Sequence, residues 1–197
     1  MVLNIRNLPI QGSRKVDVRS RSGTMALRAV AVGIGLCCAG CAGHRPFVAT
    51  PVAPGILVGQ HPRGAADYDL LRAQGVRTIL SLQVMPWDVA HGRSHAKTFG
   101  FAYRHVPVSA SPLEPGQASI QEALALLRDP ELRPVFMHCN LGRDRAALMV
   151  GLFRVQEEGW SPEAAWDEML RSGFKVSWWL SGLRKYFWNH SRQAVLP

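Results

Sequence analysis

Hydrophobic residues between positions 56 and 188 fall into short apolar runs and longer amphipathic stretches. The apolar runs, bounded by glycine, proline or polar residues, predict strands over Ile56–Gly59, Val76–Leu82, Phe101–Val108 and Pro134–Met137. The amphipathic stretches predict helices over Asp67–Ala73, Arg93–Phe99, Ile120–Leu127, Arg143–Glu158 and Trp178–Trp188, with a further helix beginning at Ser161-Pro162. Strands that alternate with helices predict an α/β fold, a three-layer sandwich with a mainly parallel central sheet.

The N-terminal region has a different pattern. Residues 1–28 carry six basic residues and one acid, and Ala29–Gly40 then carries no charge. As a helix this uncharged run spans about 18 Å at about 1.5 Å per residue, well short of the ~30 Å hydrocarbon core of a bilayer. The order of the two segments predicts the core of a secretory signal peptide rather than a membrane-spanning helix.

The uncharged run ends in Cys38-Ala39-Gly40-Cys41, which resembles the lipobox of bacterial lipoproteins. The resemblance implies that Cys41 is lipidated and becomes the mature N-terminus. Cys38 stands where a lipobox usually has leucine, and a leader of this length is long for the type, whereas a start at Met25 gives an ordinary one. The alternative is an apolar N-terminus that is not cleaved.

Three parts are therefore expected: an N-terminal extension with a lipoprotein-type signal peptide over residues 1–41, a flexible tether rich in proline and glycine over 42–55, and one folded domain over 56–192. The protein is expected to be exported and lipid-anchored at a bacterial membrane, facing the periplasm or the cell exterior. The full chain has a net charge of +9, but the part from Cys41 onward has 17 basic and 13 acidic residues. Because no basic run with interleaved aromatic residues remains there, we expect no nucleic-acid partner.

Cys139 is the one cysteine outside the leader and its cleavage site. The segment His138–Arg145 fits the pattern His-Cys-x-x-Gly-x-x-Arg, and it follows a predicted strand and opens a predicted helix. Successive backbone N–H groups in such a loop can cradle phosphate oxygens, and the helix N-terminus adds partial positive charge. The same field stabilises a thiolate, which is the nucleophilic form of cysteine.

This spacing predicts a phosphate-binding loop with a nucleophile. Cys139 is expected to attack phosphorus and form a phosphocysteine intermediate. Gly142 allows a backbone shape that a side chain would obstruct, and Arg145 can hold two phosphoryl oxygens with its planar fork. The residues expected to bind phosphate are Asn140, Leu141, Gly142, Arg143, Asp144 and Arg145. The alternative is that Cys139 is an inert thiol at the end of a strand and Arg145 a surface residue.

These residues resemble the signature of the cysteine-based protein tyrosine phosphatases, and the atypical dual-specificity phosphatases of the plant and fungal type are the nearest group. The likeness covers about Ile56 to Gly173 and includes Val58–Pro62, Gln74–Leu82, Gly159–Ser161 and Glu168-Met169. It implies a dual-specificity-phosphatase-like fold. It also implies hydrolysis of phosphoproteins, inositol phosphates or pyrophosphates without a metal or another cofactor.

The sequence departs from that family in two places. Ala146 stands where a serine or threonine hydroxyl usually helps the thiolate to leave, so hydrolysis of a phosphocysteine is expected to be slow. The usual aspartate general acid is absent from residues 107–119, where Glu114 is the only carboxylate. Glu114 is the first candidate for the acid, Asp144 the second and Asp88 the third. A phosphate-binding module with little turnover is the second hypothesis.

Two further groups of residues receive structural interpretations. His138 is expected to form a hydrogen bond behind the loop, and the seven histidines show no spacing typical of a metal site. The aromatic residues Trp178, Trp179, Phe187 and Trp188 are expected to pack in the core. Contact with a membrane surface is the alternative for them.

Overall fold

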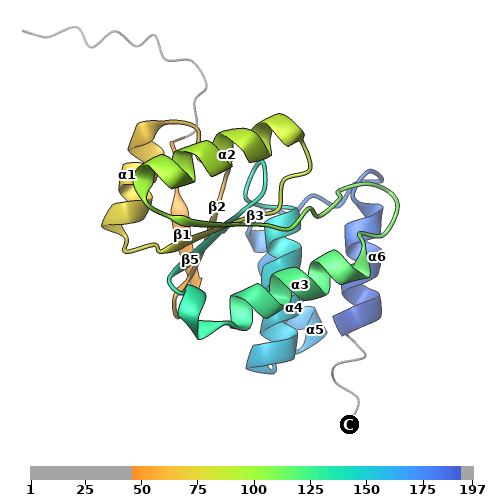
Figure 1. Ribbon diagram of the computed structural model, residues 1–197. Coiled ribbons are helices and arrows are strands. Elements are labelled where there is room, and N and C mark those ends of the chain that lie inside the picture. Colours follow the sequence, from red (N-terminus) through yellow and green to blue (C-terminus); the bar gives the residue numbers. More distant parts are fainter. Residues whose placement is uncertain (1–45, 192–197) are drawn as a thin grey trace, which may run out of the picture. The chain divides into compact units, whose positions relative to one another are not determined.

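The computed structural model describes residues 46–191, which form a twisted sheet covered by helices on both faces (Figure 1). The strand order in this part of the chain is β1-β2-β5-β3-β4. Strands β2, β5, β3 and β4 run parallel, and β1 pairs antiparallel with β2 at one edge. The strands are β1 Ala49–Ala53, β2 Ile56–Gly59, β3 Thr78–Ser81, β4 Ala102–His105 and β5 Val135–His138. The predicted α/β class with a mainly parallel sheet is confirmed.

Side-chain alternation along the strands divides the core into two layers. Ile79 and Phe136 pack with α1 and α2 on one face, whereas Leu80 and Met137 pack with the remaining helices on the other (Figure 1). The helices are α1 Ala65–Ala73, α2 Pro86–Phe99, α3 Gln117–Arg128, α4 Arg145–Glu158, α5 Pro162–Arg171 and α6 Ser181–Ser191, with a short 3-10 helix at Pro130–Leu132.

Helix α4 is the central helix of the second layer. Every residue from Arg145 to Val155 is buried, because the sheet covers one side of the helix and α3, α5 and α6 cover the others. A helix surrounded in this way carries apolar residues on all sides. Its N-terminus is therefore fixed by packing along its length.

The predicted strands and helices are all present, and their ends differ by up to seven residues. The largest difference is α2, which begins at Pro86 rather than at Arg93. Proline is well suited to the first turn of a helix, where its missing N–H has no partner to lose. None of the helices within residues 46–191 has the length and apolar character needed to cross a membrane.

The tether expected over residues 42–55 is wrong for its second half. Residues Ala49–Ala53 form β1, in which Ala49 pairs with Gly59 and Thr50 with Val58. The exposed Thr50 and Pro51 do not fit an apolar strand pattern, so the sequence did not predict this strand. An edge strand tolerates proline and exposed polar residues. The predicted signal peptide and Cys41 lie outside the described residues.

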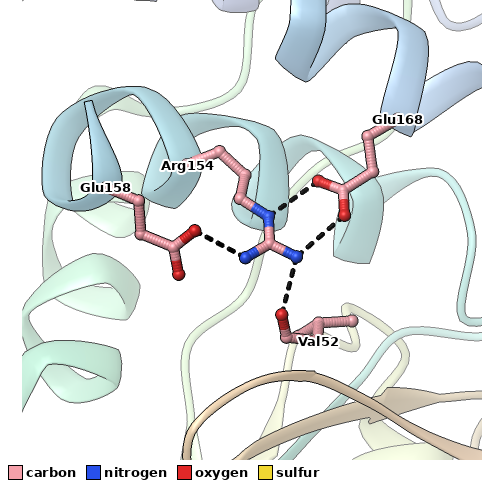
Figure 2. Close-up of polar contacts among 4 residues, drawn as sticks. All are labelled: Val52, Arg154, Glu158 and Glu168. Atoms are coloured by element: carbon pink, nitrogen blue, oxygen red, sulfur yellow. Dashed lines mark hydrogen bonds and ion pairs between the residues drawn. The ribbon is translucent and has the colours of Figure 1, made fainter. Parts of the chain in front are cut away.

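Arg154 ties β1 to the helical layer (Figure 2). Its guanidinium donates to both carboxylate oxygens of Glu168 at 2.8 Å, to Glu158 at 2.6 Å and to the Val52 carbonyl at 2.6 Å. The group also lies over the ring of Trp160 at 4.7 Å. The hydrogen bonds to Glu168 raise the pKa of Arg154 further above its usual value. A single side chain of α4 thus holds α5 and the edge strand.

We expect Arg154→Met to lower the free energy of unfolding by about 3 kcal/mol, because two carboxylates lose their cation in a largely buried site. Urea denaturation measures this loss. Arg72→Met is the matched control, since the Arg72–Asp69 pair is exposed and such pairs contribute about 0–1 kcal/mol. Equal losses in the two variants would contradict the structural role of Arg154.

Candidate active site

The segment between β5 and α4 lies at the carboxyl edge of the parallel strands. β5 ends at His138, α4 begins at Arg145, and the residues between them form a loop. In open α/β sheets this edge is where ligands bind. The N-terminus of a fourteen-residue helix points its free N–H groups into the loop.

The loop rests directly on the backbone that follows β2. Gly142 has φ +70°, and a Cβ placed there would lie 2.3 Å from the Gly59 carbonyl carbon and 2.5 Å from the Gln60 nitrogen. The backbone N–H of His61 also donates to the Asn140 carbonyl at 3.2 Å. Because no side chain fits between the two backbones, glycine is required at position 142 for both its conformation and its size.

Arg145 joins the loop to the ends of two neighbouring strands. It is 9% exposed, and its Nη1 donates to the carbonyls of Leu82 at 3.0 Å and Val108 at 3.4 Å. These carbonyls lie just beyond β3 and β4. Carbonyl oxygens orient a guanidinium without neutralising it, so the full positive charge stays beside the loop.

Cys139 lies at the floor of this arrangement. It is a free cysteine and is 2% exposed. A ligand therefore reaches its sulfur only by entering the loop. A small tetrahedral anion such as phosphate suits both the backbone N–H groups and the charge of Arg145.

A row of four imidazoles runs from the back of the loop toward α2. The ring centroids are 5.1 Å apart for His138 and His61, 5.5 Å for His61 and His91, and 4.1 Å for His91 and His95. His138 Nδ1 lies 3.3 Å from the Cys139 carbonyl, behind the loop as the sequence predicts. Burial lowers the pKa of His138 to about 3, and it also lowers the pKa values of His61 and His91. His138 is accordingly neutral at pH 7.

The candidate acids occupy three different places. Asp144 is within the loop, where Oδ1 accepts the Lys175 backbone N–H at 3.2 Å and Oδ2 lies 3.7 Å from Arg143 Nε. The exposed Glu114 accepts a hydrogen bond from Asn189 of α6 at 3.0 Å.

Asp88 lies in the first turn of α2. None of the contacts described for these three carboxylates involves Cys139 or Arg145. Of the three, only Asp144 lies in the phosphate loop, because it is one of the loop's own residues.

Three features of the site were missed in the sequence. The support given by Gly59 and His61 was not predicted, although both belong to the segment Val58–Pro62 that resembles the phosphatases. The carbonyls that orient Arg145 carry no signal in the sequence, because any residue supplies a carbonyl. The spacing of the histidines in the sequence concealed how close their rings lie, since His61 and His138 are brought together by the parallel pairing of β2 with β5.

A cysteine at the end of a central parallel strand, a loop closed by arginine and a buried helix behind it define the cysteine-based phosphatase class. Residues 61–177 match the family described as "DSP-PTPase phosphatase fused to NAD+ Kinase". This match covers more than half of the chain. The chain belongs to this family.

Individual relatives agree with this assignment. The dual specificity protein phosphatase TpbA of Pseudomonas aeruginosa (strain UCBPP-PA14) is 34% identical over 73 residues, which are 35% of this chain and 34% of TpbA. The matched region thus spans about a third of the length of that relative. The core catalytic domain of the PP-IP phosphatase SIW14 from S. cerevisiae, in complex with citrate, superposes with a TM-score of 0.61 at 21% identity, over 72% of this chain and 84% of that one.

PTPMT1 in complex with PI(5)P has a TM-score of 0.54 at 21% identity, over 75% of this chain and 99% of that one. At such identities the two structural comparisons show a shared fold.

We expect Gly142→Ala to destabilise the protein by about 3 kcal/mol or more, because the added methyl group meets backbone atoms and the positive φ is strained. Gly159→Ala is the control. It has a similar φ of +69° but no atom within 4 Å, so strain alone should cost about 1–2 kcal/mol. Urea denaturation separates the two terms, and equal losses would show that the close approach to Gly59 is unimportant.

Stability is expected to fall as the pH drops below about 6.5. Because burial lowers the folded-state pKa values of His61, His91 and His138, the unfolded chain binds more protons, and the stability present above pH 6.5 is lost on acidification. Each such group contributes up to about 1.4 kcal/mol per pH unit. His138→Asn should flatten the plot of unfolding free energy against pH between 7 and 5. A slope equal to that of the unaltered protein would contradict this assignment.

Proposed function

We propose that this protein is a phosphatase that hydrolyses phosphate monoesters through a phosphocysteine intermediate. The observation that carries the proposal is the placement of Cys139 and Arg145 at the two ends of one loop, at the N-terminus of α4 and at the carboxyl edge of the sheet. The family to which the chain belongs supports the same activity.

The reaction has two steps. In the first, the Cys139 thiolate attacks phosphorus, an S–P bond forms, and the bond from phosphorus to the leaving oxygen breaks as that oxygen takes a proton from an acid. In the second, water attacks phosphorus, the S–P bond breaks, and the water proton passes to the same carboxylate. Arg145 and the loop N–H groups hold the phosphoryl oxygens in both steps.

The substrate is proposed to be a phosphorylated protein or a small-molecule phosphate such as an inositol phosphate. TpbA is a dual specificity protein phosphatase, SIW14 a PP-IP phosphatase, and PTPMT1 binds PI(5)P. The loop of this chain recognises the phosphate group that such molecules share. The surfaces around the loop then decide which carrier is accepted.

The location proposed for the protein rests on the N-terminal pattern. A basic segment, an uncharged run and Cys41 support export and lipid anchoring at a bacterial membrane. Mass spectrometry of the membrane fraction, compared with a Cys41→Ala variant, tests for the lipid.

The relatives are phosphatases and so favour turnover over the alternative, a phosphate-binding module with little turnover. A single observation supports that alternative. Ala146 is fully buried directly after Arg145 and offers no hydroxyl to assist the second step. In that case phosphate affinity would be ordinary, and the phosphocysteine would accumulate.

Cys139→Ser is expected to lower kcat/KM for an aryl phosphate by at least about 10⁴-fold, because the nucleophile is removed. The measurement uses the full chain under reducing conditions, with p-nitrophenyl phosphate. In the unaltered protein, a burst of product equal to the enzyme concentration, followed by slow turnover, would indicate the second function. Full activity in Cys139→Ser would refute the proposed mechanism.

The same assay assigns the acid by the leaving group. Loss of a general acid costs typically 10²–10⁴-fold, and the loss is larger for phenyl phosphate than for p-nitrophenyl phosphate because its leaving oxygen is more basic. Glu114→Gln and Asp144→Asn are compared in this way. The variant whose loss depends on the leaving group identifies the acid, whereas an equal loss with both substrates indicates a structural role.

A further inference from the structure

Large apolar side chains are exposed around the candidate active site. Trp178 is 74% exposed, Trp87 68% and Trp179 57%. The expectation that Trp178 and Trp179 pack in the core is therefore wrong, although Phe187 is fully buried. We use the name apolar rim for six exposed residues: Met85, Trp87, Leu113, Leu141, Trp178 and Trp179.

Five of the rim residues come from four loops that meet at one edge of the sheet, and Trp87 lies in the first turn of α2, directly after the first of these loops. Three of the loops follow β3, β4 and β5, whose carboxyl ends lie together because these strands are parallel. The fourth joins α5 to α6, and it is held to the phosphate loop by the bond from Lys175 N–H to Asp144 Oδ1. A bond from the Gly182 N–H, at the start of α6, to the Ser111 carbonyl, 3.2 Å long, connects the end of this fourth loop to the loop after β4.

The composition of this edge fits a lipid surface. Tryptophan combines a large apolar ring with a polar N–H and is favoured where an apolar medium meets water. Exposed Lys175 and half-buried Arg143 lie in these loops, and exposed Arg93 of α2 lines a hollow together with Val84 of the loop after β3. Of the acids there, Asp144 and Glu114 already have polar partners within the protein. Aromatic residues with flanking cations match a bilayer that contains anionic headgroups.

The start of the domain lies at the same edge. Ala49 pairs with Gly59 at the carboxyl end of β2, and the Pro46 carbonyl accepts a hydrogen bond from Gln60 at 3.3 Å. Pro46 and Val48 line a hollow of about 330 Å³ together with Leu141 of the loop. Pro46 is five positions after Cys41, so a lipid on Cys41 would hold this edge within roughly 18 Å of the membrane, at about 3.5 Å per residue.

We propose that the apolar rim, with its flanking cations, docks on a phospholipid bilayer that contains anionic lipids. Docking places the phosphate loop at the level of the lipid headgroups. Docking goes beyond the proposed hydrolysis. Vesicle binding can be measured whether or not the protein turns over a substrate, so failure of one does not imply failure of the other. A lipid phosphate carried by the membrane would then reach Cys139 without leaving the bilayer.

Sedimentation with vesicles tests the proposal on the full chain carrying Cys41→Ala, so that no attached lipid contributes. The vesicles contain phosphatidylcholine alone or phosphatidylcholine with phosphatidylglycerol. Trp178→Ser/Trp179→Ser is expected to weaken binding by about tenfold or more, because apolar surface no longer enters the lipid. Leu70→Ser, which removes an exposed leucine from α1, is the matched control and should bind like the parent chain.

The charge term has its own test. Arg93→Gln and Lys175→Gln should each weaken binding to the anionic vesicles by about fivefold, with no change on phosphatidylcholine alone. Circular dichroism confirms that each variant is folded, and the N-terminal segment is the same in all of them. Binding of the double tryptophan variant equal to that of the parent would overturn the proposal. A second result would also overturn it: the parent chain does not bind vesicles but self-associates in analytical ultracentrifugation, and the double tryptophan variant does not self-associate.

Discussion

The contact between two stretches of backbone, Gly142 in the loop and Gly59 at the end of β2, is the constraint on which the site depends. It leaves no room for a side chain, and it is possible only because β2 and β5 pair in parallel and end at the same level. The shape of the loop is therefore set by the sheet and not by the loop sequence alone. Loop residues whose side chains point outward are free to vary without changing the cradle for phosphate.

The two buried arginines of α4 show how the same residue type serves opposite purposes. Arg154 meets two carboxylates, so its charge is neutralised and it holds three elements together. Arg145 meets two carbonyl oxygens, which fix its direction and leave its charge uncompensated. An uncompensated buried charge is costly to fold, but a bound phosphate supplies the missing anion. The difference in partners separates the stabilising arginine from the one suited to a ligand.

Local patterns predicted the elements that local physics determines. The apolar run before Cys139 and the proline after Ser161 placed β5 and α5 correctly, because strand burial and helix starts depend on neighbouring residues. β1 was missed because its pairing with β2 is what makes Thr50 and Pro51 extended. The prediction that Trp178 is buried was wrong for a related reason. Burial also depends on contacts between elements, and the spacing of residues along the chain cannot show whether another element covers a side chain.

The site separates two kinds of recognition by depth. At its floor, Cys139 and Arg145 meet a ligand through charge and backbone N–H groups, which are specific for phosphate and indifferent to what carries it. At the same edge of the sheet, Trp87 at the start of α2 and Trp178 in the loop after α5 expose apolar surface that phosphate cannot use. A free phosphate or a small polar ester gains nothing from these rings. Under the proposed function, they would favour a carrier with apolar area next to its phosphate. If the proposed function holds, selectivity among phosphate monoesters would arise at the start of α2 and in the loop after α5, and not in the phosphate loop.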